Sequence, residues 1–506
     1  MTDPNLPAAP EYREDDDRAG WHRLDVRMLV VRPLNELLGL IPLLVGLLVL
    51  GNGDVWRTVV SGVVIAAVVL FGLLHWLTTR YRITDEQVEL RTGLLVRKRL
   101  AVPRDRIRSV DLTAKPGHRL FGLSAIKVGT GRQDKPGEDG LTLDAVTSAE
   151  AERLRLLLLE RRAPDTTADT AVAGTTLSTL DKRWLRFAPL TLSGLVAVGA
   201  LAGVVFNAAR DVDVDLMKPL TDAAIRLAHE PATTSVPLIA GAVVTLSTIG
   251  SLVFYVVQYW NFRLTREPDR TIRVRRGLVT TRSVSISEDR LRGVEIREPL
   301  MLRWGRGART AAVTTGLGTK GASDLLLPPA PAPEAHRVAA EVLRAERSPT
   351  EAPLSPHPTA ALRRRMVRAL VPPVILTGVL AWSAPSWTWQ AALALTAFCA
   401  YLGWDRYRAL GHALSDGYLV TRSGSLLRET AALHQSGVIG WRIRRSYFQR
   451  RAGLATISAT TAAGDGEYHV VDVAERDGLT FAATAVPDLL RPFLIEDDQN
   501  DQATPE

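Results

Sequence analysis

Arginine is the residue type best placed to bind a ligand in this 506-residue chain, whose formal net charge is +8. Basic groups held near an anionic membrane leaflet each gain roughly 1 kcal/mol of binding free energy. Arginines that could bind anionic lipid or a protein partner recur in three segments: Arg104, Arg106, Arg108, Arg290, Arg292, Arg303, Arg306, Arg442, Arg444 and Arg445. The pattern leaves three roles open, namely general attraction to the leaflet, a specific headgroup pocket and the solvated face of a strand.

The sequence offers no candidate catalytic centre. Its nine histidines are scattered, and neither a His-Glu-x-x-His metal motif nor a Gly-x-Ser-x-Gly nucleophile motif occurs. The single cysteine, Cys399, lies within a long apolar run, so neither a disulfide framework nor a cysteine metal cluster is expected. We therefore expect a protein that is not an enzyme and that carries no cofactor. No basic strand interleaved with aromatic residues is evident, so nucleic acid is not expected as a partner.

A glycine-rich stretch at residues 316–321, Gly-Leu-Gly-Thr-Lys-Gly, matches the dinucleotide-binding fingerprint. That mechanism needs a helix directly after the loop, because the helix N-terminus receives the pyrophosphate. Here the following residues lead into Pro328-Pro329, which is typical of a strand that ends at the two prolines. The stretch is therefore predicted to be a β-hairpin.

Asp211, Asp213 and Asp215 alternate in a segment predicted to lie outside the cell. Such carboxylates suit calcium, but a calcium site needs six or more oxygen ligands. We expect an acidic external loop and no metal site.

These candidates belong to a frame that occurs three times. In each copy, a glycine expected in a turn is followed by a second marked residue, at the same distance along the sequence in all three copies. Another glycine follows at nearly the same distance in each copy. The three sets are Gly93, Arg106 and Gly122; Gly277, Arg290 and Gly305; and Gly424, Gly437 and Gly453. Alternating apolar residues and interspersed glycines predict short antiparallel strands in each copy. Each copy is closed by a helix, expected after a capping box at residues 147–150, from Pro333, and at 487–493.

Each copy follows long uncharged runs that predict membrane spans, since a bilayer core needs roughly 20 apolar helical residues. The runs cover residues 37–53, 58–79, 187–209, 231–262 and 369–404, and the last holds two short spans turning at 384–386. Six spans in three pairs are therefore expected. Most of the flanking basic residues, among them Arg364, Arg365, Arg368 and Arg406, lie on the side of the two termini. The positive-inside rule places both termini and all three modules in the cytosol, on the cytoplasmic membrane.

These features give the following predicted organisation. The segments are a disordered tail (1–20), a first transmembrane pair (21–79), module 1 (80–163), a linker (164–179), a second transmembrane pair (180–261) with an external loop (207–235) that holds a short surface helix, module 2 (262–347), a proline-rich linker (348–360), a third transmembrane pair (361–406), module 3 (407–494) and an acidic tail (495–506).

Two spans followed by a small strand-rich module, three times over, resemble a known family. The residues that carry the resemblance are Tyr81-Arg82-Ile83-Thr84, Gly93-Leu94-Leu95 and Leu120-Phe121-Gly122 in copy one, with Phe262-Arg263-Leu264-Thr265 and Gly277-Leu278-Val279 in copy two. The chain is similar to the bacterial membrane-flanked domain proteins of the YdbS/YdbT type, whose soluble part is pleckstrin-homology-like (PH-like). The resemblance implies that each module is a seven-strand, partly open β-barrel capped by a C-terminal helix, and it supplies no catalytic residues.

The expected role is a scaffold or adaptor that presents three cytosolic PH-like modules to anionic lipid or to a protein partner. That partner could be another membrane-flanked domain protein, and envelope stress defence is one setting for such a scaffold. The alternative is a membrane protein that moves or rearranges lipid or another amphiphile. A continuous polar groove between the spans would favour the alternative, whereas open strand edges or basic faces on the modules would favour the scaffold.

We expect the isolated second module, residues 262–347, to sediment with anionic vesicles but not with neutral ones. Binding should weaken with salt, because the Debye length falls from about 30 Å at 0.01 M to about 10 Å at 0.1 M. Charge reversal at Arg290, Arg292 and Arg306 should abolish it. A module that ignores vesicles at all salt concentrations would rule out a lipid role for these arginines.

Overall fold

The computed structural model describes most of the soluble part of the chain. The described residues are 20–29, 76–84, 86–93, 98–107, 109–129, 141–159, 174–191, 229–315, 324–383 and 388–490, with scattered positions in 31–74 and 196–226. The first span pair, most of the third span and external loop, the aspartates at 211–215 and the 316–321 glycine stretch therefore lie outside the described residues.

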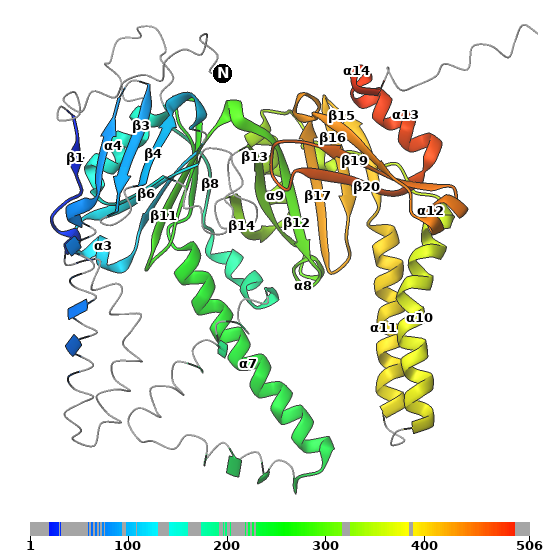
Figure 1. Ribbon diagram of the computed structural model, residues 1–506. Helices are drawn as coiled ribbons and strands as arrows, with labels where there is room; N and C mark the ends of the chain where they lie inside the picture. The colour runs from blue at the N-terminus through cyan, green and yellow to red at the C-terminus, as the bar shows by residue number, and fades with distance from the viewer. Residues whose placement is uncertain are drawn as a thin grey trace, which may run out of the picture.

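All three modules share one plan of three antiparallel strands, a 3₁₀ turn, a strand, a one-turn helix, two more strands and a closing helix (Figure 1). Module 1 comprises β2 (Arg80–Ile83), β3 (Gln87–Thr92), β4 (Lys98–Pro103), η2 (Arg104–Arg106), β5 (Ser109–Ala114), α3 (Pro116–Leu120), β6 (Leu123–Gly129), β7 (Thr142–Thr147) and α4 (Ser148–Leu159). Module 2 comprises β9 (Arg263–Arg266), β10 (Thr271–Arg276), β11 (Thr281–Ser287), η4 (Glu288–Arg290), β12 (Leu291–Pro299), α8 (Leu300–Trp304), β13 (Gly307–Thr314), β14 (Leu325–Pro331) and α9 (Ala332–Leu343). Module 3 comprises β15 (Gly411–Ser415), β16 (Tyr418–Ser423), β17 (Leu427–His434), η6 (Gln435–Gly437), β18 (Gly440–Arg444), α12 (Tyr447–Arg451), β19 (Leu454–Thr460), β20 (Glu467–Ala474) and α13 (Glu475–Ala485).

The repeated turn glycines are required by backbone geometry. Gly93, Gly277 and Gly424 have φ of 107°, 108° and 100°, a region that residues with a side chain rarely adopt. A Cβ on Gly277 would lie 2.0 Å from the carbonyl oxygen of Thr280. The glycine spacing therefore marks the same turn in each copy, between the second and third strands, as the sequence predicted.

The sheets run from one module into the next. Module 1's fourth strand, β5, pairs with β11, the third strand of module 2, within a seven-stranded sheet. In the same way β12 of module 2 pairs with β17 of module 3 within a six-stranded sheet. Seven strands per module were expected, and modules 1 and 2 have seven when β1 (His22–Arg23) and β8 (Thr175–Thr179) are included. Each module was expected to be a partly open barrel. The sequence did not predict that a strand of the next module pairs at the open edge of modules 1 and 2.

The hydrophobic core follows the shared sheets. Val420 and Ala432 of module 3 pack in the same core cluster as Val294 and Ile296 of module 2. At the first junction an ion pair joins Arg282 to Asp111, and at the second Arg428 lies 3.6 Å from Glu298. Cross-strand apolar contacts and opposite charges each stabilise a sheet, so the three modules form one stack.

Three helices project from the same side of the row of sheets: α7 (Ala232–Tyr259), α10 (Thr359–Ser383) and α11 (Thr388–Arg408) (Figure 1). Within the described residues, two helical segments are long and apolar enough to cross a membrane, Thr233–Tyr259 and Thr359–Trp382. Helix α11 returns alongside α10, as expected for the third pair. Helix α10 begins ten residues before the uncharged run that starts at Ala369, so Arg364, Arg365 and Arg368 lie on the helix itself.

Several predicted connections are structured. Residues 164–179 were expected to be a linker, yet Thr175–Thr179 form β8 and pair with β9. Phe187 was expected to begin the third span, but it is fully buried against Leu302 in module 2, within the 3₁₀ helix η3 (Lys182–Leu190). Ser348 and Thr350 of the proline-rich linker are also buried.

The helix that closes module 3 is also placed differently from the prediction. It is α13 and not residues 487–493, of which only the short α14 (Pro487–Leu490) is helical among the described residues. Phe481, Ala482 and Ala485 bury its apolar face in the module 3 core. Pro487 instead begins α14, a separate short turn that follows α13.

The shared sheets also change how the vesicle experiment must be done. Excising residues 262–347 would leave β11 without β5 and β12 without β17. Exposed strand edges promote aggregation, so lipid binding has to be measured on the full chain.

We expect Gly293→Ala to weaken the second junction, because the added Cβ would lie 2.0 Å from the carbonyl oxygen of Ala432. Overpacking of this kind costs typically 1–3 kcal/mol. Amide hydrogen exchange of the full chain in detergent should accelerate in both β12 and β17. Gly241→Ala on α7, where a Cβ would meet nothing within 4 Å, is the matched control and should exchange as the wild type does. Acceleration confined to β12 would contradict the shared-sheet junction.

Candidate functional site

A cavity of about 910 Å³ lies where α10 and α11 meet module 3. Arginine supplies most of its charged lining, and apolar side chains line it as well. The lining residues used below are Arg364, Arg365, Arg368, Arg406, Arg444, Arg445, Asp472, Gln449, Ala369, Leu402, Leu426 and Leu427. We call it the arginine cavity.

Helix geometry brings four of these arginines together from both arms of a hairpin. Arg364, Arg365 and Arg368 are spaced so that they share one face of α10. Arg406 lies in the last turn of α11, which ends beside the start of α10. The two helices approach closely because Gly403 has no side chain, and a Cβ there would lie 2.8 Å from that of Ala369.

The arginine cavity holds more positive than negative charge. Asp472 is 1% exposed and pairs with Arg364 and, at 3.1 Å, with Arg365, while Arg445 pairs with Glu475. Gln449 donates a hydrogen bond of 2.9 Å to Asp472, which fixes the carboxylate between the two guanidinium groups. Arg368, Arg406 and Arg444 have no acidic partner within 4 Å in the described part of the chain. Three unneutralised guanidinium groups around one cavity favour an anion.

The cavity lies where the apolar part of α10 begins. The uncharged part of α10 begins at Ala369, one residue after the last arginine of the cavity. Nearby on α11, the guanidinium of Arg408 lies 4.7 Å from the Trp404 ring centroid, and Trp404 is 44% exposed, as expected of an interfacial anchor. Leu426, which also lines the cavity, is 62% exposed. The lining of the arginine cavity therefore combines guanidinium groups with apolar side chains.

Two of the ten arginines predicted as candidates, Arg444 and Arg445, line the arginine cavity. Arg303 is paired at 2.6 Å with Asp405 of α11, and Arg442 is paired with Glu467. The remaining described candidates lie elsewhere, with Arg106 and Arg306 exposed and Arg104, Arg290 and Arg292 partly buried. Arg108 lies outside the described residues. The structure therefore does not gather the predicted arginines into one site.

From the sequence, four arginines were assigned to membrane topology and not to a binding site: Arg364, Arg365, Arg368 and Arg406. A usable signal was present, because three of them follow helical spacing directly before an apolar run. The fourth lies at the end of the returning span. What the sequence could not supply is the β18 strand that closes the cavity from the side of module 3.

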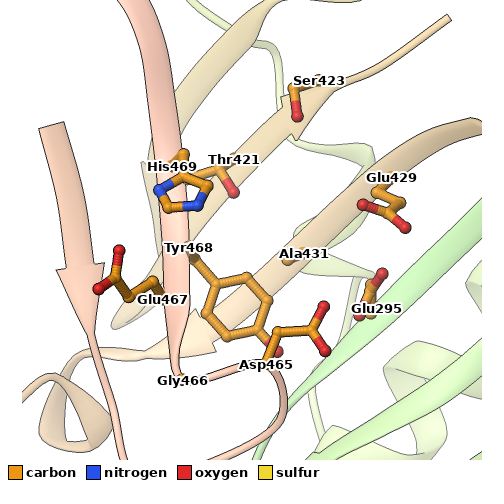
Figure 2. A pocket seen from close by; sticks show the side chains of 10 residues that line it. All are labelled: Glu295, Thr421, Ser423, Glu429, Ala431, Asp465, Gly466, Glu467, Tyr468 and His469. Atoms are coloured by element: carbon orange, nitrogen blue, oxygen red, sulfur yellow. The ribbon is translucent and has the colours of Figure 1, made fainter. Parts of the chain in front are cut away.

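A second cavity, of about 640 Å³, is acidic and lies where β12 of module 2 meets module 3 (Figure 2). Glu295, Glu429, Asp465 and Glu467 approach it from β12, β17 and the turn into β20. Glu295 and Glu467 are neutralised by Arg297 and Arg442. The described residues contain no cluster of three or more potential metal ligands. Burial, together with Glu295 and Asp465, raises the pKa of Tyr468, so its hydroxyl stays protonated beside these carboxylates.

Comparison with known proteins gives a consistent picture of the chain. The family model described as "Bacterial PH domain" matches residues 37–162, 207–346 and 367–481. The UPF0699 transmembrane protein YdbT of Bacillus subtilis (strain 168) is 22% identical over 445 residues, which cover 83% of this chain and 88% of that protein. No solved structure matches. A transmembrane relative and two candidate spans together indicate a membrane protein.

Module 3 should lose stability in acid because of a buried histidine pair beside the arginine cavity. The rings of His357 and His412 lie 5.1 Å apart, and burial, with smaller contributions from His412 and Arg365, lowers the pKa of His357 to about 4. The unfolded chain binds the proton more tightly, with an ordinary histidine pKa of about 6.5. The free energy of unfolding is therefore at its full value above about pH 6.5. It falls by roughly 3 kcal/mol as the pH drops toward 4.

Thermal unfolding of the full chain in detergent, followed between pH 7 and pH 4, tests this expectation. The variant His357→Gln should show a shallower fall in melting temperature than the wild type. His22→Gln removes an exposed histidine at the other end of the protein and should keep the wild-type slope. Equal slopes for all three proteins would show that His357 does not titrate as expected.

Proposed function

Because the chain belongs to the bacterial PH domain family, we propose that it is a non-enzymatic membrane adaptor whose third module binds the headgroup of an anionic lipid. The observation that carries this proposal is the set of unneutralised arginines, Arg368, Arg406 and Arg444, that line the cavity where α10 and α11 meet β18. A phosphate group offers the oxygen acceptors that a guanidinium group prefers. Apolar residues that line the same cavity, such as Leu402 and Leu427, suit the start of an acyl chain.

The magnitude expected for this site is modest and measurable. Each basic group near an anionic leaflet contributes roughly 1 kcal/mol, so three give about 3 kcal/mol, or on the order of a hundredfold preference for anionic lipid. Asp472 supports the site because it holds Arg364 and Arg365 in place. We infer that headgroup binding fixes module 3, and through the shared sheets the whole stack, against the leaflet.

The proposed topology is six spans in three hairpins in the cytoplasmic membrane, with both termini in the cytosol. The charge asymmetry of the sequence supports this orientation. The described helices α7, α10 and α11 support it too, because they leave the stack on one side (Figure 1). With the modules on the cytosolic side, the arginine cavity would face the inner leaflet, which carries the anionic lipid.

The alternative role, moving an amphiphile between leaflets, would need a polar path along the spans. The contact between α10 and α11 instead includes a local hydrogen bond, 3.0 Å between the hydroxyls of Thr377 and Thr396. These two hydroxyls therefore hydrogen-bond to each other within the hairpin. We therefore favour binding over transport.

We expect the double variant Arg368→Gln/Arg406→Gln to bind anionic lipid about 30-fold more weakly, because it removes two contributions of roughly 1 kcal/mol. The measurement is native mass spectrometry of the full chain in detergent, titrated with phosphatidylglycerol and, separately, with phosphatidylcholine. Wild-type protein should retain phosphatidylglycerol selectively.

The matched control is Arg153→Gln/Arg347→Gln, which neutralises two exposed arginines in modules 1 and 2. It has the same net charge as the test variant and should bind like the wild type. If both double variants lose phosphatidylglycerol equally, attraction is general to the whole protein and the arginine cavity is not the site.

A further inference from the structure

The strand pairing that joins the modules leaves two equivalent strand edges unpaired among the described residues. At each junction the fourth strand of one module pairs with the third strand of the next, β5 with β11 and β12 with β17. The equivalent strands at the two ends are β18, the fourth strand of module 3, and β4, the third strand of module 1. In the described part of the chain, β18 pairs only with β19 and β4 only with β3. Each therefore presents an open edge.

Both junctions use the same register. Ser109 lies opposite Ile286 at the first junction, and Gly293 opposite Leu433 at the second. Aligning the modules on Gly93, Gly277 and Gly424 shows that these two pairs are equivalent positions. The same register applied to β18 sets Gly440 at the place of Gly293. It then aligns Ile443 with Ile296, and Arg444 with Arg297.

Burial shows that β18 lacks a strand that its equivalents possess. Leu112 and Ile296 are 8% and 0% exposed at the two junctions. Ile443, at the same position of β18, is 41% exposed. Gly440 of β18 occupies the position of Gly293, the glycine that lets the carbonyl oxygen of Ala432 approach at the second junction. An exposed isoleucine on an open edge is what strand addition would cover.

Charge decides which strand fits. At the second junction Arg297 lies directly opposite Glu429, and Glu298 directly opposite Arg428. The carboxylates that pair with Arg297 come from its own module, Glu295 and Asp324. In β18 the position of Glu295 holds Arg442, and Arg444 has no acidic partner within 4 Å among the described residues, so the incoming strand has to supply a carboxylate to Arg444. The chain's own open third strand carries Lys98 at the position of Glu429. Like charges directly opposite in a sheet destabilise it, so a second copy of this chain is a poor partner.

We propose that β18 is a docking edge for the third strand of a PH-like module in another protein, and that this strand carries a carboxylate opposite Arg444. The partner extends the row of modules by one, through the junction already used twice within the chain. The proposal stands on the sheet edge and not on headgroup binding. Because Arg444 also lines the arginine cavity, the test is built on Ile443, whose side chain points to the other face of β18.

The probe is this chain itself with Lys98→Glu, which gives β4 the carboxylate that the proposal requires. Two differently tagged full-length chains are co-expressed, both with Cys399→Ser. The acceptor carries Ile443→Cys. The donor carries Lys98→Glu and Arg99→Cys, because Arg99 falls directly opposite Ile443 in the junction register. Mild oxidation of isolated membranes should give a disulfide-linked heterodimer.

Two matched donors set the comparison. In the first, Leu100→Cys replaces Arg99→Cys; its thiol points to the opposite face, and cross-linking should fall at least tenfold. In the second, Lys98 is kept, and like charge should also reduce cross-linking at least tenfold. Absence of any heterodimer, or equal yields for the two cysteine positions, overturns the docking edge. Equal yields with and without Lys98→Glu overturn the requirement for a carboxylate and would identify a second copy of this chain as an acceptable partner.

A further variant separates docking from lipid binding. Adding Arg368→Gln/Arg406→Gln to the acceptor should leave the cross-linking yield unchanged while phosphatidylglycerol binding falls. Loss of both would mean that the cavity and the edge act as one site, which contradicts the proposal.

Discussion

Backbone hydrogen bonding between neighbouring modules is the constraint on which the rest of this structure depends. A strand edge presents unpaired N–H and C=O groups, and modules 1 and 2 each satisfy theirs by pairing with the third strand of the next module. The arrangement buries Leu112 and Ile296, which an isolated module would expose. The unit of stability is therefore the stack, although the repeat in the sequence is one pair of spans plus one module.

The membrane helices and the stack restrict each other. Helix α7 leads directly into β9, and α11 leads directly into β15, so the position of each helix end is fixed by a strand. The ion pair between Arg303 of module 2 and Asp405 of α11 ties the third hairpin to the preceding module as well. The arginine cavity results from this restriction, since its arginines come from a helix pair and from a strand that only the folded module holds in register.

Local pattern was enough to predict the repeated plan, because turn glycines and strand alternation are local properties. Gly93, Gly277 and Gly424 marked the same turn in each copy, and Pro333 falls in the first turn of α9 as expected. Pairing of β5 with β11 could not be predicted, because residues far apart in the chain share no periodic signal. The ion pairs of the candidate arginines could not be predicted for a related reason, because Arg303 and Arg442 are paired with Asp405 and Glu467, carboxylates elsewhere in the chain. Phe187 was misplaced since burial in a module and burial in lipid select the same residue type.

The order of strands along the chain has a consequence for synthesis. Strand β5 leaves the ribosome long before β11, and the candidate span in α7 lies between them. At 5–20 residues per second, the edge of β5 waits on the order of ten seconds for its partner. Helix α7 is therefore synthesised and placed while the edge of β5 is still unpaired, and a delay in placing α7 would leave that edge free to pair with the wrong strand. Translation speed across the spans thus becomes a determinant of correct assembly.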